Sequence, residues 1–342
     1  MTINIGLATS DALVFGCDSV ASATTPFLDP FGMKWEHDTE GKLLQDADGK
    51  FSLKFDFNDL NRVVTNAWGG VTKMFELHAH PSPIVGVTAG VAKLNERPIA
   101  SYATDFFALD ENRHLKSSNE IAAVFLKFMR AAYEEHYKGS GEPESIREGP
   151  EFLVGGYGED EPFPSIYRIR VKENDVTMEF GPSGRIGRAG VSWNGQSDAV
   201  ERFIRGYDGY LKRDIEQLIR QELRAVSEIA AKEFAAFVND LLAKLGQALP
   251  EGTKFELPEM KASTIDWVQY GVSIDFANLP LQEAINFVGF LVVLQAGKSR
   301  FARGVPTVGG HVHVGVITKK DGFKPLEEPK LLHRLRGFTD DL

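Results

Sequence analysis

Thr2 is the residue of this sequence that is best suited to nucleophilic chemistry. A threonine hydroxyl is a weak nucleophile at neutral pH and needs a base beside it. Removal of Met1 would make Thr2 the N-terminal residue, and its own α-amine, with an ordinary pKa of about 7.7–8.0, could then take the hydroxyl proton. The small side chain at position 2 permits that removal. Thr2 therefore suggests a hydrolase with an N-terminal nucleophile, although threonine at this position commonly has no chemical role.

Two His-x-His pairs and a glycine-rich segment suggest other chemistry. The pairs are His78 with His80 and His311 with His313. On a strand each pair would share one face and could bind zinc, with His37 or Asp38 as a third ligand. However, the first pair runs into a turn-like PSP, and the sequence has neither a His-Glu-x-x-His motif nor a cysteine cluster. The segment GPSGRIGRAG lacks the Gly-Lys-Ser/Thr of a phosphate-binding loop. We therefore expect no metal and no cofactor.

Apolar patterning predicts the short strands that would hold Thr2 in place. Residues 3–8 and 12–17 are expected to form a hairpin around a turn at Ser10 and Asp11. Further apolar runs predict strands over residues 70–77, 83–90, 152–158, 164–171, 175–180 and 311–318. Residues 26–66 have the features of an insertion, with a hairpin signal at Asp48-Gly49.

Helical periodicity predicts four helical segments, over residues 93–108, 118–138, most of 198–248, and 280–297. The third carries an apolar stripe at three- and four-residue steps from Ile215 to Leu245. Ser227 and Asn239 interrupt the stripe, which leaves two shorter helices possible. The stripe could either fold back on its own domain or form a contact between subunits. Hairpins and helices that are segregated in this way indicate an α+β fold with helix layers on antiparallel sheets.

Composition excludes some classes of function. The net charge of −10 disfavours a general nucleic-acid binder, which would carry a basic patch. The longest apolar stretch, INFVGFLVVLQAG, is too short to span a bilayer, so we expect no membrane association. A single cysteine, Cys17, rules out a disulfide within the chain. With no visible secretory signal, these features favour the reducing cytoplasm.

Four stretches of the sequence, in order, resemble the proteasome β-subunit family and its bacterial relatives. They are TINIGLATSDALVFGCDSVAS, TKMFELHAHPSPIVGVTAGVAK, FLVGGYGEDEPFPSIYRI and GGHVHVGVIT. The resemblance implies an N-terminal nucleophile (Ntn) hydrolase with a four-layer αββα sandwich, built as a single domain over residues 1–342. Residues 26–66 and 206–275 fall outside the matched stretches and would be a hairpin insertion and a helical insertion.

The resemblance also implies roles for individual residues. Thr2 matches the nucleophile that attacks a peptide or amide bond, and Asp18 matches the carboxylate that orients a lysine. Lys34 has the usual spacing from Thr2, whereas Lys73 begins a strand in the right context; we prefer Lys73 and leave Lys34 open. The ammonium would lower the pKa of the Thr2 hydroxyl and stabilise developing negative charge. Gly90 matches the position whose N–H group would meet the oxyanion.

The sequence departs from this family at supporting positions. Asn194, in SWNGQSD, stands where the family has a serine, and we expect it in the site. Before the Gly-Gly near the C-terminus, Val305 and Val308 replace a supporting Asp and Ser, and Thr307 is the remaining hydroxyl. These changes leave open a non-catalytic ring or scaffold subunit, and an Ntn amidase that acts on small amides. The resemblance implies a peptide or protein substrate and a homo-oligomer, either a ring or a dimer; an ATPase partner remains undefined.

Overall fold

The computed structural model describes residues 2–27, 34–37, 42–45, 49–51, 53–54, 61–248, 253 and 265–326. The chain divides into two compact units, one formed by Met1–Ser197 with Ile274–Leu342 and the other by Asp198–Ser273. Much of the expected insertion at 26–66, including Asp48, lies outside the described residues, as do most of residues 249–264.

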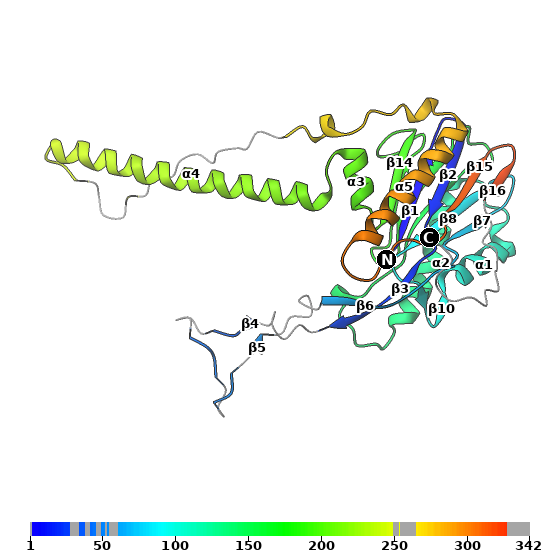
Figure 1. The fold of residues 1–342 in the computed structure, drawn as a ribbon, viewed down its shortest axis with the longest axis horizontal. Coiled ribbons are helices and arrows are strands. Elements are labelled where there is room, and N and C mark those ends of the chain that lie inside the picture. Colours follow the sequence, from blue (N-terminus) through cyan, green and yellow to red (C-terminus); the bar gives the residue numbers. More distant parts are fainter. Residues whose placement is uncertain are drawn as a thin grey trace. The chain divides into compact units, whose positions relative to one another are not determined.

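The first unit contains two five-stranded antiparallel sheets (Figure 1). The first sheet has the order β14 (Gly190–Gly195), β1 (Ile3–Ala8), β2 (Ala12–Cys17), β15 (His313–Thr318) and β16 (Gly322–Pro325). All residues of β1 and β2 are buried, which explains why both are apolar except at Asn4. The second sheet has the order β13 (Asp175–Phe180), β12 (Ser165–Arg170), β11 (Glu151–Gly156), β8 (Ile84–Ala89) and β7 (Met74–His78).

Side chains from both sheets share one core, which includes Leu13 and Phe15 of the first sheet and Val85, Val87 and Leu153 of the second. Arg168 of β12 also links the sheets, because it pairs with the buried Glu179 of β13 at 2.7 Å and donates to the carbonyl of Trp193 in β14 at 2.8 Å. Strand β14 is therefore held both by its pairing with β1 and by Arg168 of the second sheet.

Helices pack on both sheets of this unit. Helix α5 (Leu281–Phe301) packs on β1, β2 and β15. Its approach is close, since a Cβ on Gly16 would lie 2.4 Å from the Val288 side chain. Helices α1 (Ile99–Ala108) and α2 (Ser118–Tyr137) pack on the second sheet through an aromatic core that includes Phe106 and Phe125. This arrangement is a mixed fold of helices and antiparallel sheets, as expected at the level of fold class.

The remaining elements of the first unit are short. A two-stranded hairpin joins β3 (Ala21–Phe27) to β6 (Asn61–Trp68), and β4 (Lys34–Trp35) pairs with β5 (Leu53–Lys54). The strands β9 (Lys93–Leu94) and β10 (Arg97–Pro98) precede α1. Short 3-10 turns cover Asp110–Asn112, Glu144–Ile146 and Phe276–Asn278.

The second unit is helical. It contains α3 (Asp198–Arg205), α4 (Gly209–Lys244) and a 3-10 turn at Trp267–Tyr270. The Asp208 carboxylate caps α4 by accepting hydrogen bonds from the N–H groups of Tyr210 and Leu211, each at 2.9 Å. α4 has 36 residues and is about 54 Å long at 1.5 Å per residue. None of its residues, all of which the structure describes, is buried.

Most of the expected strands and helices are confirmed, with three differences. The helix expected from residue 93 begins at Ile99, because Pro98 is its N-cap and residues 93–98 form a tight hairpin with Asn95 and Glu96 at positive φ. The segment 198–248 breaks at 206–208 and not at Ser227, whose hydroxyl bonds to the Leu223 carbonyl within a continuous helix. Strands β3, β6, β9, β10, β14 and β16 were not expected. Within the described residues, no helix combines the length and apolarity needed to cross a membrane.

Candidate active site

The β1–β2 hairpin brings Thr2 and Asp18 together. The Thr9 hydroxyl accepts a hydrogen bond from the Ala12 N–H at 3.0 Å and donates to Asp11 at 2.9 Å, which closes the turn. The register of this hairpin pairs Asn4 with Cys17. Ile3 therefore lies opposite Asp18, the residue that follows β2. The Ile3 N–H group accordingly donates to the Asp18 carboxylate at 3.1 Å.

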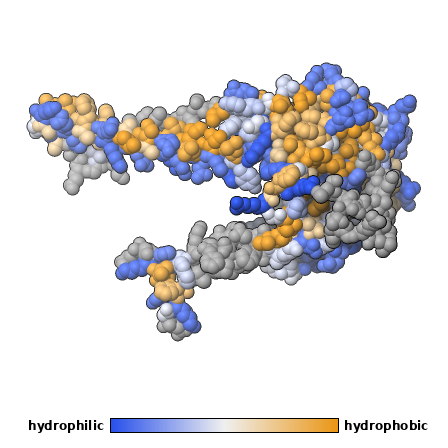
Figure 2. Space-filling view, in the orientation of Figure 1, coloured by the Kyte–Doolittle hydropathy of each residue, from blue (hydrophilic) through white to orange (hydrophobic). Residues whose placement is uncertain are grey.

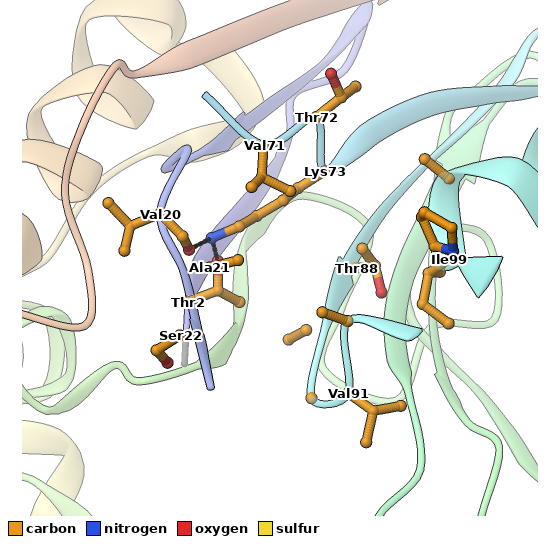
Figure 3. Close-up of a pocket in the computed structure, with 15 residues that line it drawn as sticks. Thr2, Val20, Ala21, Ser22, Val71, Thr72, Lys73, Thr88, Val91 and Ile99 are labelled. Atoms are coloured by element: carbon orange, nitrogen blue, oxygen red, sulfur yellow. Dashed lines mark hydrogen bonds between the residues drawn. The ribbon is translucent and has the colours of Figure 1, made fainter. Parts of the chain in front are cut away.

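Lys73 completes a cluster of three polar side chains. Its Nζ donates to Asp18 Oδ1 at 2.6 Å and also to the Thr2 hydroxyl and the Val20 carbonyl. Figure 3 shows the lysine side chain reaching the hydroxyl of Thr2 and the carbonyl of Val20. The Thr2 hydroxyl in turn donates to Asp18 Oδ1. The nucleophile candidate therefore contacts both an acceptor and a cationic donor.

Backbone N–H groups hold the Asp18 carboxylate in place. Its Oδ2 accepts hydrogen bonds from the N–H groups of Val20 at 3.2 Å and of Gly309 at 3.1 Å. Asp18 is almost completely buried, and a buried carboxylate requires such partners to remain charged. Gly309 belongs to the loop between α5 and β15, so this loop also helps to build the site.

Burial lowers the pKa of the Lys73 ammonium below its ordinary value, while the charge and hydrogen bond of Asp18 act in the opposite direction. The backbone at Lys73 is held by the second sheet, since its carbonyl accepts a hydrogen bond from the Thr88 N–H at 3.1 Å. Lys73 is thus a rigidly held cation that loses its proton more readily than a surface lysine.

A pocket opens beside this cluster (Figure 3). Its wall consists of Thr2 and residues 20–22, 71–73, 88–92 and 98–100. Gly90 lies in this wall with a φ of +86°, and a Cβ there would be 2.5 Å from the Gly149 carbonyl oxygen, so only glycine fits. Gly90 and Thr2 therefore border the same space. The role of the Gly90 N–H group towards an oxyanion stays a prediction.

Asn194 does not join the cluster, contrary to our expectation. It pairs with Asn4 across β14 and β1, and the two side chains bond to each other at 2.7 Å. Gln196 is the residue that contacts Thr2 instead, because its N–H group donates to the Thr2 carbonyl at 2.6 Å. A Cβ on Gly195 would lie 2.1 Å from that same carbonyl oxygen. The side chain of Asn194 is therefore bonded to Asn4 and not to the cluster of Thr2, Asp18 and Lys73.

Thr307 and Ser19 support the site in ways that the sequence did not reveal. The Thr307 hydroxyl donates to Gln196 Oε1 at 2.8 Å, and the Ser19 hydroxyl accepts from the His311 N–H at 2.7 Å. The sequence identifies Thr307 as a hydroxyl near the Gly-Gly but does not reveal its partner, because Thr307 and Gln196 are far apart in sequence. Gln196 itself carried no recognisable signal.

The competing candidates are placed elsewhere. Lys34 lies in β4, where it pairs with Lys54 of β5, and it is Lys73 that contacts Thr2. Met1 and Asp38 lie outside the described residues. Burial raises the pKa of the Cys17 thiol to about 12, which leaves it protonated and unreactive at neutral pH.

Histidines in the described part of the chain are not arranged as a metal site. The His78 ring nitrogens lie within hydrogen-bond distance of the backbone carbonyls of Ala79, Ser82 and Asn112, at 2.9–3.2 Å. Among the described residues, no group of three or more His, Cys, Asp or Glu side chains could hold an ion.

Comparison with known proteins adds structural neighbours only. No family model and no curated protein sequence matches this chain. The solved structures that match include Anbu proteins. An Anbu (Gly-1) mutant from Hyphomicrobium sp. strain MC1 has 11% identity and a TM-score of 0.45, with 95% of this chain and 87% of that chain covered.

Two further Anbu structures match at similar levels. The helical assembly of the Anbu complex from Pseudomonas aeruginosa has 11% identity and a TM-score of 0.43, covering 95% of this chain and 84% of that chain. Anbu (ancestral beta-subunit) from Yersinia bercovieri has 10% identity and a TM-score of 0.41, covering 96% and 88%. Anbu proteins are proteasome-like but form a distinct family. The expectation of a bacterial proteasome homologue is therefore wrong, and the chain is similar to Anbu instead.

Proposed function

We propose that this chain is an N-terminal threonine hydrolase that cleaves amide bonds in peptides, with Thr2 as the nucleophile once Met1 has been removed. The observation that carries the proposal is the contact of the Thr2 hydroxyl with both Asp18 and Lys73 at the edge of a pocket. A hydroxyl with an ordinary structural role does not need a buried carboxylate and a buried ammonium at once.

In the proposed reaction, Thr2 Oγ1 attacks the substrate carbonyl carbon while the hydroxyl proton passes to the free α-amine of Thr2. The carbonyl π electrons move to oxygen, and the Gly90 N–H group donates to this oxyanion. Collapse of the intermediate breaks the C–N bond, and the leaving amine takes the proton from the α-ammonium. Water then attacks the resulting ester by the same route, which releases the acid and restores Thr2.

Lys73 and Asp18 have electrostatic roles in this proposal. The Lys73 ammonium stabilises the negative charge that develops on Thr2 Oγ1 as its proton leaves. Asp18 holds that ammonium, and its charge and hydrogen bond oppose the lowering of the Lys73 pKa by burial. The backbone N–H groups of Val20 and Gly309 fix Asp18, so the cluster needs little rearrangement during the reaction.

We also propose that the first unit is a four-layer αββα sandwich of the Ntn type. The packing of α5 on one sheet, of α1 and α2 on the other, and the core between the sheets support it. The chain would then be one hydrolase domain with insertions near residues 26–66 and 206–275. The second insertion has nearly the same residue bounds as the helical unit at Asp198–Ser273. The single buried cysteine favours a cytoplasmic location.

Assembly into a homo-oligomer is the remaining part of the proposal. α4 carries exposed large apolar side chains at helical spacing, namely Leu211, Leu218, Val226, Ile229, Phe234, Phe237 and Leu241. Figure 2 shows orange, hydrophobic patches along this helix. An apolar stripe of this length gains free energy by covering itself with a second copy of the helix.

The proposed activity is tested with the purified full chain and a panel of fluorogenic peptide amides. Mass spectrometry of the N-terminal peptide first establishes whether Thr2 is exposed. Thr2→Ala should abolish hydrolysis with an unchanged thermal midpoint, while Thr2→Ser should retain part of it. Full activity in Thr2→Ala would overturn the proposal. Inactivity of the wild type with exposed Thr2 would favour a non-catalytic scaffold, and cleavage of small amides alone an amidase.

A further inference from the structure

A pair of buried asparagine side chains between β1 and β14 has no part in the proposed reaction. Asn4 lies opposite Asn194 in the register of these strands, and the two residues are 0% and 3% exposed. Asn4 Nδ2 donates to Asn194 Oδ1 at 2.7 Å. The other two amide atoms, Asn4 Oδ1 and Asn194 Nδ2, have no hydrogen-bond partner among the residues that the structure describes. Burial of an unpaired polar group costs free energy, so the pair calls for an explanation.

The two asparagines lie at a place where apolar side chains would be more stable. Side chains alternate along a strand, so Asn4 shares a face of β1 with Ala8, which belongs to the core between the two sheets. Cys17, which lies opposite Asn4 on β2, belongs to the same core. Replacing both partners of a buried hydrogen bond by apolar groups of the same shape is nearly neutral or stabilising. Stability alone therefore does not explain why this pair is present.

The pair distinguishes the observed register of β14 against β1 from its nearest alternatives. A shift by one residue would turn the buried side chains of β14 to the opposite face, so the apolar pattern already excludes it. A shift by two residues keeps every side chain on its face, and would place Asn194 opposite Gly6 or Thr2. Either shift would separate the two buried amides and leave both unpaired. A buried asparagine specifies register in coiled coils for the same reason.

The register of β14 decides which residue holds the backbone of Thr2. Gln196 directly follows the strand, and its N–H group donates to the Thr2 carbonyl at 2.6 Å. A shift by two residues would move this N–H group by about 7 Å along the strand, out of reach of that carbonyl. The bond from Arg168 to the Trp193 carbonyl ties β14 to the second sheet and not to β1, so it does not replace the asparagine pair.

We infer that Asn4 and Asn194 are positioning residues: their buried pair fixes the register that places the Gln196 N–H group on the Thr2 carbonyl, and thereby orients the nucleophile. This inference rests on the proposed hydrolase function. The pair acts through Gln196 and does not contact the substrate. A displacement of the reacting group by about 1 Å can lower a rate by about 10²-fold, so accurate placement of Thr2 outweighs the cost of two half-paired amides.

The test compares Asn4→Leu, Asn194→Leu and the double variant, because leucine has nearly the shape of asparagine. Each single variant should lower the thermal midpoint, since it leaves the other amide buried and unpaired. The double variant should regain a midpoint equal to or above that of the wild type. Its kcat for a fluorogenic peptide amide should nevertheless be about 10²-fold lower, with KM unchanged. Asn286→Leu, at an exposed position of α5, is the control and should change neither quantity.

A double variant with the kcat of the wild type would overturn the inference, and so would one that is less stable than either single variant. Amide hydrogen exchange keeps this question apart from the hydrolase proposal. The Gln196 N–H group should exchange faster in the double variant than in the wild type, while the amides of β8 stay equally protected. If no peptide is cleaved, this result supports the positioning role while the hydrolase proposal fails. Equal protection of Gln196 in both proteins contradicts the positioning role directly.

Discussion

Lys73 and Thr2 adjoin strands of different sheets, yet Nζ of Lys73 donates a hydrogen bond to Oγ1 of Thr2. Thr2 immediately precedes β1 of the first sheet, and Lys73 immediately precedes β7 of the second. The cluster therefore depends on how the two sheets pack as well as on either hairpin. Changes that shift one sheet against the other should affect it even when they are distant in sequence.

Replacing Lys73 should remove most of the proposed activity. We expect Lys73→Ala to lower kcat by about 10²-fold or more, the usual cost of removing one preorganised electrostatic group. Lys34→Ala is the control and should remain close to the wild type. Peptide hydrolysis at saturating substrate measures both, and loss of activity in Lys34→Ala alone would show that our choice of lysine is wrong.

The buried Glu179 should make the protein sensitive to acid. Burial acts to raise the pKa of this carboxyl, but the hydrogen bond and charge of Arg168, helped by Ser192 and Arg185, hold it below its ordinary value of 4.5. Its contribution to stability is thus present above that value and is lost as the pH falls through the lowered pKa. Glu179→Gln should be less stable than the wild type at neutral pH, with a smaller further loss on acidification.

Chemical denaturation at several pH values below 5 measures this difference. Glu120→Gln, a change on the exposed face of α2, controls for the removal of a surface charge. The prediction is contradicted if the free energies of unfolding of the wild type and of Glu179→Gln change by the same amount over this pH range.

Gly90→Ala should destabilise the protein and also impair the site. The new methyl group would stand 2.5 Å from the Gly149 carbonyl oxygen at a φ of +86°, so backbone strain and a clash combine. Gly139→Ala is a matched control, because its φ of +73° carries similar strain with no atom within 4 Å. We expect about 1–2 kcal/mol of destabilisation for the control and more for Gly90→Ala, by thermal unfolding. Equal effects in the two variants would contradict the close packing at Gly90.

The exposed stripe on α4 should mediate self-association. Light scattering should give a mass above that of the 37.8 kDa chain at micromolar concentration. Replacement of Ile229 and Phe237, which are 57% and 63% exposed, by lysine should lower this mass, because charged side chains cannot be buried in an apolar contact. Gln217→Lys, a polar position of the same helix, should leave the mass unchanged. A wild type that is monomeric throughout this range would exclude the assembly.

Sequence patterns predicted the central hairpin well, because β1 and β2 are buried throughout and mostly apolar, with polar residues at Thr9–Asp11 and Asp18 marking their ends. Strand β14 was missed, since Gly190 and Gly195 at its ends resemble a flexible connection, although both glycines are required by close contacts with Phe180 and Thr2. Asn194 was misplaced for the same reason. Without the register of β14 against β1, a sequence cannot tell which of two neighbouring polar residues faces the site.

The burial of Thr2 imposes an order of events on the proposed enzyme. Thr2 is 4% exposed, Ile3 is fully buried, and the Thr2 carbonyl is held by the N–H group of Gln196. An aminopeptidase must bind the residues that follow the bond it cuts, and in the folded protein Thr2 and Ile3 are buried. Maturation should therefore take place on the nascent chain, before β1 enters the sheet. Molecules that fold first would keep their methionine and remain permanently inactive in an otherwise native population.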